Sequence, residues 1–214
     1  LAIGCGVGYS DRDDYSVSES IFGTTKPAVI YNGYTVPSKN ADGAVVGVTF
    51  IRPSQPKQWR YMQLLGGRNH FFGVEWLTLK TDVPRIVFIV EGTINWLSAM
   101  QTIGGAVIDG MRTVVLGAPS ATTPVDRSIV AQLCPTDIVV ALADKDRAGE
   151  GGATRWCNAV SQSPASATGH IIYPSLGLNN PVDFNDLLLL QNKGAFNIIT
   201  WWENQIAAIK ESLL

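Results

Sequence analysis

The segment DIVVALADKDRAGEGG, residues 137–152, places an apolar run directly before two aspartates and a glycine-rich stretch. Such a run predicts a buried strand, followed by a turn and then a helix. Asp144 and Asp146 are only one residue apart, where the predicted strand ends. Two carboxylates this close repel each other, so the pair needs either open solvent or a cation.

The segments on both sides of this one repeat the same alternation. We expect apolar strands at 85–92, 112–118, 137–144 and 170–175. We expect helices at 93–104, 124–134, 147–163 and 183–194, and an amphipathic helix in the C-terminal tail. Apolar strands that alternate with helices predict an α/β fold, with a mainly parallel sheet that is covered by helices on both faces.

The first part of the chain has a different texture. AVVGVTFI (44–51) is rich in β-branched residues and follows the turn signal KNADG (39–43), which predicts an antiparallel hairpin of strands 28–36 and 44–51. We therefore expect a smaller mixed α+β subdomain over 1–82 and the parallel sheet over 83–192. The helix in 193–214 would pack on this core or link it to a further domain.

Composition limits the function classes. The chain has 214 residues, of which 46% are hydrophobic and 16% charged, as in globular domains. No run approaches the roughly 20 apolar residues of a membrane span, so we expect no membrane partner. The three cysteines lie far apart without metal-ligand spacing, which favours a cytoplasmic location and argues against a zinc site. The first residue is Leu rather than Met, which suggests a piece of a longer protein.

Charge is distributed unevenly, although the net charge is only −2. Residues 51–85 contain six basic and two acidic residues, whereas acids concentrate elsewhere. A basic patch beside an acidic site can serve a polyanion and a metal separately. On charge alone, a scattered solvated surface is an equally good interpretation.

Acidic residues follow three of the predicted strands. Glu91 ends one strand, Asp144 and Asp146 end another, and Asp183 and Asp186 follow the last. The reactive crevice of an open parallel sheet lies at the carboxyl ends of its strands. A single acid there, such as Glu91, is more often a structural cap, but three converging groups would be costly without a cation. Mg²⁺ prefers oxygen ligands and keeps waters that a phosphate can displace, so we expect a divalent metal here.

Glycines near these acids suggest a phosphate site. Gly92 follows Glu91, and Gly149 lies three residues after Asp146. Small residues at a strand-to-helix turn let a phosphate approach backbone N–H groups at the helix N-terminus. Arg147 would either neutralise the acids or reach a phosphate; the alternative is that it simply forms a surface ion pair.

Three motifs carry a family resemblance. VFIVEGTINWLSAM (87–100), VVALADKDRAGEGGA (139–153) and NPVDFNDLL (180–188) resemble, in order and spacing, the Toprim domain of bacterial primases and topoisomerases. DKDRAG is most similar to the form found in DnaG-type primases and phage primase-helicases. Upstream, LAIGCGVGYSDR, YNGYTVPSKNADGAVVGVTFIRP and QWRYMQL resemble the N-terminal subdomain of the primase RNA-polymerase region. This looser match argues against a topoisomerase.

The resemblance implies roles for individual residues. Glu91 corresponds to the catalytic glutamate, and the metal ligands for Mg²⁺ or Mn²⁺ correspond to Asp144, Asp146 and Asp183. The basic surface that guides the template would include Arg52, Lys57, Arg60 and Arg68.

Two positions depart from the family pattern. Asn95 and Asn185 are amides where DnaG-type proteins usually carry acids, and Asp186 either compensates for them or begins a helix. Fewer carboxylates imply weaker or fewer metal sites. Asn95, Asn185 and Asp186 are therefore candidates for an additional site that the sequence alone does not establish.

The resemblance implies a DNA primase catalytic core, a nucleotidyltransferase that makes short RNA primers on single-stranded DNA from ribonucleoside triphosphates. A replicative helicase, in trans or in the same polypeptide, would be its partner, and a phage or plasmid origin fits the divergence. Two alternatives keep the fold: a Toprim-type metal-dependent nuclease, and a nucleic-acid-binding module whose catalysis is weakened or lost.

Overall fold

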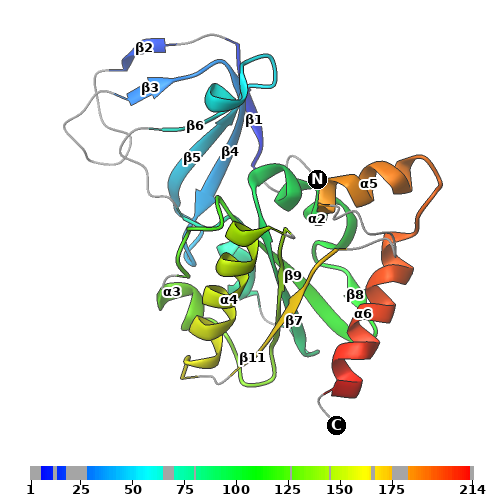
Figure 1. The fold of residues 1–214 in the computed structure, drawn as a ribbon. Helices are drawn as coiled ribbons and strands as arrows, with labels where there is room; N and C mark the ends of the chain where they lie inside the picture. Colours follow the sequence, from blue (N-terminus) through cyan, green and yellow to red (C-terminus); the bar gives the residue numbers. More distant parts are fainter. Residues whose placement is uncertain are drawn as a thin grey trace.

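The computed structural model describes residues 6–11, 14–17, 28–64, 70–79, 81–125, 127–144, 146–164, 167–174 and 183–212. These residues form a four-stranded antiparallel sheet, a five-stranded mainly parallel sheet and a two-stranded ribbon (Figure 1). The antiparallel sheet lies beyond the end of the parallel sheet from which α2 and α4 start (Figure 1).

The larger sheet has the strand order β11-β10-β7-β9-β8. Its strands are β7 (Arg85–Glu91), β8 (Val107–Ile108), β9 (Met111–Ala118), β10 (Ile138–Leu142) and β11 (Thr168–Ile172). β7, β9, β10 and β11 run parallel, and only the short edge strand β8 is antiparallel. The prediction of a mainly parallel sheet is therefore confirmed. β8 was not predicted because two residues carry no periodicity, and β11 begins two residues before the predicted strand.

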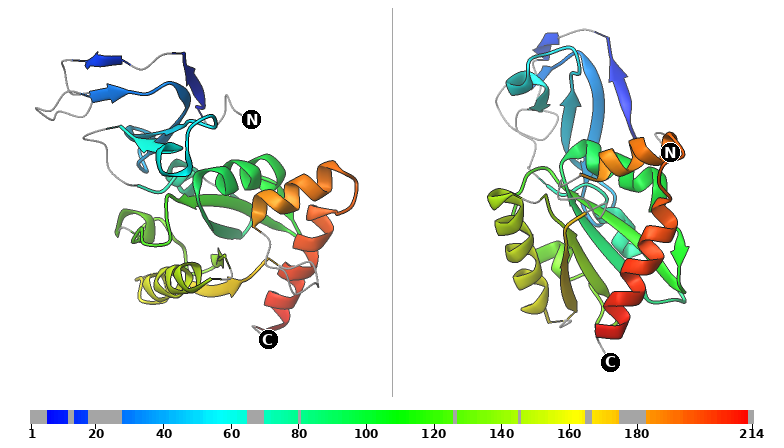
Figure 2. Two further views of the ribbon diagram at one scale, coloured as in Figure 1. Left: turned by 45° about the horizontal axis from the view of Figure 1, so that its top comes forward. Right: turned by 45° about the vertical axis from the view of Figure 1, so that its right-hand side comes forward.

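Helices cover both faces of this sheet (Figure 2). One face is covered by α2 (Thr93–Ile103), α5 (Phe184–Asn192) and α6 (Ile198–Ser212), and the other by α3 (Arg127–Val130) and α4 (Arg147–Ser161). Because successive strand residues point to opposite faces, Phe88 packs with Trp202 while its neighbour Val87 packs in the cluster that contains Trp156. None of the helices in the described segments is both long and apolar enough to cross a bilayer.

The helix predicted at 124–134 is much shorter than expected. Only Arg127–Val130 is α-helical, and turns follow it. Pro135 disfavours helical conformation at Cys134. The loop is instead held by Asp137, which accepts hydrogen bonds from the Cys134 N–H at 2.7 Å and from the buried Arg85 guanidinium at 2.6 Å. This ion pair lies at the amino end of β7, away from the acidic residues.

The smaller sheet has the order β1-β4-β5-β6, with every neighbouring pair antiparallel. Its strands are β1 (Gly8–Ser10), β4 (Gly33–Lys39), β5 (Val45–Ile51) and β6 (Tyr61–Gln63). The predicted turn is present between β4 and β5, where the Asn40 side chain accepts hydrogen bonds from the N–H groups of Asp42 and Ala44.

The predicted strand 28–36 is wrong as a single element. Its first residues form β3 (Ala28–Ile30), which pairs with β2 (Asp14–Val17) in the separate ribbon. The chain then resumes as β4 at Gly33, which has φ +144. A Cβ at this position would lie 2.4 Å from the Ile51 carbonyl oxygen, so only glycine fits the break. Two short 3-10 turns, η1 (Lys57–Trp59) and η2 (Val74–Thr78), complete this part of the described chain.

Candidate functional site

The acidic residues meet at the carboxyl edge of the parallel sheet. β7 and β10 are parallel neighbours, with Val90 opposite Leu142, so Glu91 and the aspartates after Leu142 emerge side by side. Asp183 enters the same place from the start of α5. The Asp144 carboxylate is electrostatically coupled to Glu91, Asp183, Asp146 and Asp186, in that order of strength. The structure thus brings the sequence-predicted acids to one edge.

Asp144 is the electrostatic centre of this group. Burial, followed by repulsion from the neighbouring carboxylates, raises its pKa from an ordinary 3.8 to about 6. Glu91 also has a raised pKa: burial is the main cause, the Ala121 backbone amide opposes it, and repulsion by Asp146 adds to it. Burial likewise raises the pKa of Asp183, and the hydrogen bonds that its carboxylate accepts from backbone N–H groups partly offset this rise. Burial and mutual repulsion thus both disfavour the charged form of the carboxylates at this edge.

Two of the acids also begin helices. Asp146 caps α4 by accepting a hydrogen bond from the Gly149 N–H at 2.8 Å. Asp183 accepts from the Asp186 N–H at 2.8 Å, and the Asp186 side chain accepts from the Asp183 N–H in return, which is a capping box. Asp186 thus has the helix-start role that the sequence left as one of two options. A cap engages one acceptor position of a carboxylate that has about four.

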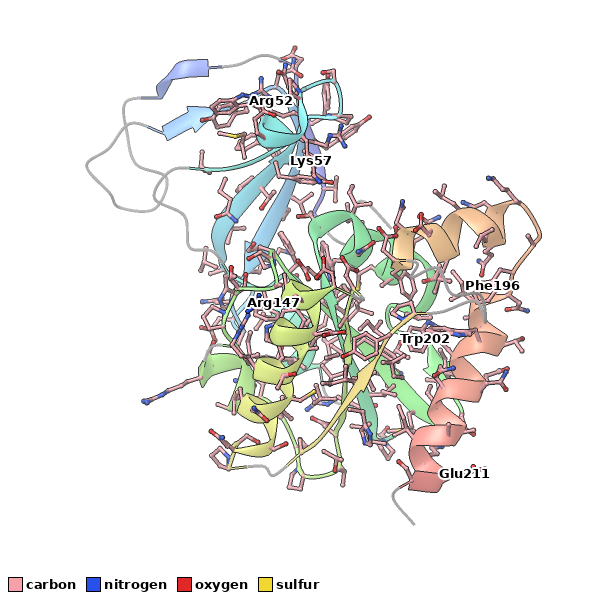
Figure 3. The ribbon with its side chains drawn as sticks, in the orientation of Figure 1. Arg52, Lys57, Arg147, Phe196, Trp202 and Glu211 are labelled. Carbon is pink, nitrogen blue, oxygen red and sulfur yellow. The ribbon has the colours of Figure 1, made fainter. Side chains whose placement is uncertain are left out.

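Residue 149 must be glycine for a steric reason. An added Cβ would lie 2.4 Å from the Asp144 carbonyl oxygen and 3.0 Å from the Asp144 nitrogen. The first turn of α4 can therefore approach the backbone of Asp144 only because residue 149 has no side chain. Gly92 has φ +86 and donates its N–H to Ala118 at 2.8 Å, which orients the start of α2 beside Glu91. Arg147 is exposed at the first residue of α4, on the side nearer the antiparallel sheet (Figure 3).

The two amides form a neutral bridge between α2 and α5. Asn95 Oδ1 accepts from the Asn185 N–H at 3.1 Å, and Asn95 Nδ2 donates to the Glu91 carbonyl at 3.0 Å. Asn185 Oδ1 accepts from the Ser98 hydroxyl at 3.1 Å. At these two positions, where the resemblance implies acids, neutral side chains form hydrogen bonds between the helices.

A cavity of about 430 Å³ opens between the two sheets beside these residues. The parallel-sheet side contributes Gly92, Thr93, Ile94, Asn95, Pro119, Asp183 and Asn185, and the antiparallel sheet contributes Thr49, Tyr61 and Gln63. The sequence did not single out these last three residues. Period-2 alternation places Thr49 and Ile51 on one face of β5, but nothing local to the sequence says that this face meets the acids.

The predicted basic residues lie on the antiparallel sheet and its turns. Arg52 is half-buried, donates to the Asn32 carbonyl at 3.2 Å and lies 5.2 Å from the centre of the Tyr31 ring. Lys57 and Arg60 are exposed in and after η1. Figure 3 shows Arg52 and Lys57 in the part of the molecule opposite α6. Arg68 lies outside the described residues.

The donor chemistry fits a hard divalent cation. In the described segments, no three His, Cys, Asp or Glu side chains stand close enough to hold a metal ion together. Mg²⁺ does not need such a cage, because it is commonly bound by one or two carboxylates together with waters and substrate phosphates. Asp144 and the neighbouring Glu91 supply carboxylate oxygens, and a bound cation would relieve the burial and repulsion that raise their pKa values.

No family model and no curated protein matches the sequence. Solved structures do match. A DnaG primase catalytic domain bound to ssDNA is 15% identical over 94% of this chain and 66% of its own, with a TM-score of 0.62. The chain has the fold of a DnaG-type primase catalytic core.

Two further structures share this primase-core fold. The Escherichia coli primase catalytic core is 14% identical over 89% of this chain and 64% of its own (TM-score 0.60). The zinc-binding and RNA polymerase domains of the Aquifex aeolicus primase are 18% identical over 91% of this chain and 49% of their own (TM-score 0.58). The chain thus spans about half to two thirds of the length of these structures.

Proposed function

We propose that this chain is a Toprim-type primase catalytic core that joins ribonucleoside triphosphates into short RNA primers on single-stranded DNA. One observation carries the proposal. Five carboxylates from three segments interact electrostatically at one sheet edge, where Asp183 also lines a cavity of about 430 Å³, in a chain with the primase-core fold. A structural neighbour with this fold is a DnaG catalytic domain bound to ssDNA, which supports the same polymer as ligand.

In this proposal Asp144, Asp146 and Asp183 are the candidate ligands of Mg²⁺ or Mn²⁺. Because the three are not close enough to hold an ion together, one or two of them would bind it, and waters and substrate phosphates would complete its coordination. A bound divalent ion would supply charge neutralisation for a triphosphate and would make a 3′-hydroxyl more acidic. Glu91 accepts the proton, for which its raised pKa suits it, because a general base works best when its pKa approaches the working pH.

Groups around the acids would position the substrates. Arg147 reaches the triphosphate from the first residue of α4, and Gly92 and Gly149 allow the backbone to come close. Lys57 and Arg60 hold the template backbone. By the same resemblance we propose a replicative helicase, in trans or in the same polypeptide, as the partner and a phage or plasmid as the source.

The test is primer synthesis on single-stranded DNA with all four ribonucleotides and either Mg²⁺ or Mn²⁺. Asp144→Ala combined with Asp146→Ala should lower synthesis by about 100-fold or more, since metal-assisted charge stabilisation is worth several kcal/mol. The matched control is Glu203→Ala with Glu211→Ala, which removes the same charge from exposed positions of α6. Synthesis that is equal in both double variants, with both folded, contradicts the proposal.

A second candidate, a nucleic-acid-binding module with weakened catalysis, is favoured by the neutral Asn95–Asn185 bridge and by the absence of a three-acid cluster in the described segments. Such a module binds single-stranded DNA equally well in chelator and in Mn²⁺, and it makes no primer. Metal-dependent cleavage of labelled DNA without primer synthesis would favour the nuclease alternative.

A further inference from the structure

Three tyrosines form one cross-strand row on the antiparallel sheet. Tyr9 on β1 is opposite Tyr34 on β4, Tyr34 is opposite Ile51 on β5, and Ile51 is opposite Tyr61 on β6. Residues directly opposite each other in an antiparallel sheet point to the same face. The three rings are therefore on one face of the sheet, with Ile51 between two of them.

These rings are unusually open to solvent. Tyr9 is 63% exposed, Tyr34 49% and Tyr61 47%, whereas Ile51 in the same row is 4% exposed. The rings of Tyr9 and Tyr34 touch edge to face, with centroids 5.3 Å apart. Grouped exposed aromatic rings on one face of a monomer mark an interaction surface, unlike single exposed hydrophobic residues.

The row borders the cavity at the acidic edge. Tyr61 lines that cavity, together with Thr49 and Gln63, which are opposite each other on β5 and β6, two residues along from Ile51 and Tyr61. Period-2 alternation puts these two on the same face as the tyrosines. The cavity and the row are thus consecutive parts of one surface, which runs from the acids outward across the sheet.

The charges around the row select the kind of ligand. The three rings are uncharged, while the exposed Arg60 directly precedes Tyr61 in the chain and the exposed Lys57 lies in the preceding turn η1. Flat rings beside cationic side chains suit a strand whose bases are unpaired and whose backbone is anionic. A duplex hides the faces of its bases, and a membrane surface offers no rings to stack.

We propose that Tyr9, Tyr34 and Tyr61, here named the tyrosine row, form a base-stacking platform for single-stranded nucleic acid that continues from the cavity. This proposal rests on the proposed function only for the identity of the strand, a DNA template or the growing RNA. The platform binds through base faces, so its contribution depends little on sequence, on salt or on metal.

The test measures binding of a fluorescein-labelled oligothymidylate of about 16 nucleotides by fluorescence anisotropy, in chelator and without nucleotides. Tyr34→Ala should weaken binding about tenfold, whereas Tyr34→Phe, which keeps the ring, should bind as the unaltered chain does. The slope of log affinity against log salt should stay unchanged in Tyr34→Ala and fall by about 0.7 in Arg60→Ala. Val107→Ala, at a position 54% exposed on the distant strand β8, is the control.

An abasic strand of the same length gives the decisive comparison, because it has the backbone but no base faces. The unaltered chain should bind it more than about tenfold more weakly than oligothymidylate, and the difference should be smaller in Tyr34→Ala, which keeps two of the three rings. Equal affinity of the unaltered chain for both strands overturns the platform, as does unchanged affinity in Tyr9→Ala, Tyr34→Ala and Tyr61→Ala. If these variants instead lose a protein partner, the row is a protein-docking surface and the proposal is also overturned.

Parallel titrations with oligothymidylate and oligouridylate show whether the row prefers DNA or RNA. Failure of the platform is distinguishable from failure of the proposed function. Base-dependent binding in chelator supports the platform even if no primer is made. Primer synthesis with base-independent binding supports the function and refutes the platform.

Discussion

Replacing Gly149 by alanine should disrupt the acidic edge without touching any acid. The new Cβ would lie 2.4 Å from the Asp144 carbonyl oxygen, where ordinary contacts begin at 3.4 Å. The obstacle is backbone, so α4 or the segment that carries Asp144 must move. Overpacking of this kind costs about 1–3 kcal/mol, partly offset by the roughly 1 kcal/mol that alanine gains over glycine within a helix. We expect the free energy of unfolding to fall by about 0–2 kcal/mol.

Gly151→Ala is the matched control, two residues further along the same helix. A Cβ there meets only the end of the flexible Arg155 side chain, at 3.6 Å. This variant should gain up to about 1 kcal/mol, so the two substitutions should differ by about 1–3 kcal/mol in urea denaturation. Gly149→Ala should also bind Mn²⁺ more weakly in calorimetry, because Asp144 has moved, while Gly151→Ala should bind it normally. Equal stability and equal Mn²⁺ affinity would refute the steric argument.

Two further predictions concern the charge at the same edge. The folded pKa of Asp144, about 6, lies above the ordinary 3.8, so this group should stabilise the metal-free protein as the pH falls from about 6 to 4. Mn²⁺ binds the charged carboxylate, so it should raise the melting temperature more at about pH 7.5 than at pH 5. Asp144→Asn should remove both effects, and a Mn²⁺ response that is independent of pH would contradict the assignment. Asn95→Asp keeps the acceptor for the Asn185 N–H but replaces the amide that donates to Glu91 with a charge. It should lower the melting temperature in chelator and enlarge its rise in Mn²⁺, and equal shifts with and without metal would show that residue 95 is remote from the cation.

The sequence was most informative where burial is complete. β7 is buried from Arg85 to Val90, and its uninterrupted apolar run predicted a parallel strand. It was least informative where the chain breaks an element for a tertiary reason. Gly33 interrupts the predicted strand 28–36 because the Ile51 carbonyl approaches it from the neighbouring strand, and no local pattern encodes that approach. β8 was missed for a different reason, because its two residues show no periodicity, and the early end of α3 agrees with the local effect of Pro135.

The acids of the candidate site were accessible to sequence reasoning because they follow strands. Parallel topology alone places Glu91 and Asp144 at the same edge of the sheet. That they lie side by side depends on the pairing of β7 with β10, which the sequence does not reveal, because β9 comes between them in the chain. The second wall of the cavity was not accessible. Tyr61 and Gln63 belong to a three-residue strand, too short to show periodicity, and their position depends on how one sheet packs against another.

The amides explain how an edge crowded with carboxylates can remain folded. Each acid added beside Asp144 would raise its pKa further, as Glu91, Asp183, Asp146 and Asp186 already do. Asn95 and Asn185 instead tie α2 to α5 through uncharged hydrogen bonds, so the framework of the edge does not depend on a cation. With fewer carboxylates at the edge, waters and substrate phosphates would supply more of the ligands of a divalent ion. Mg²⁺ is commonly held in this way in phosphoryl-transfer sites. We therefore expect metal affinity to be weak in the protein alone and to rise when a triphosphate is present, which titration of Mn²⁺ with and without nucleotide can measure.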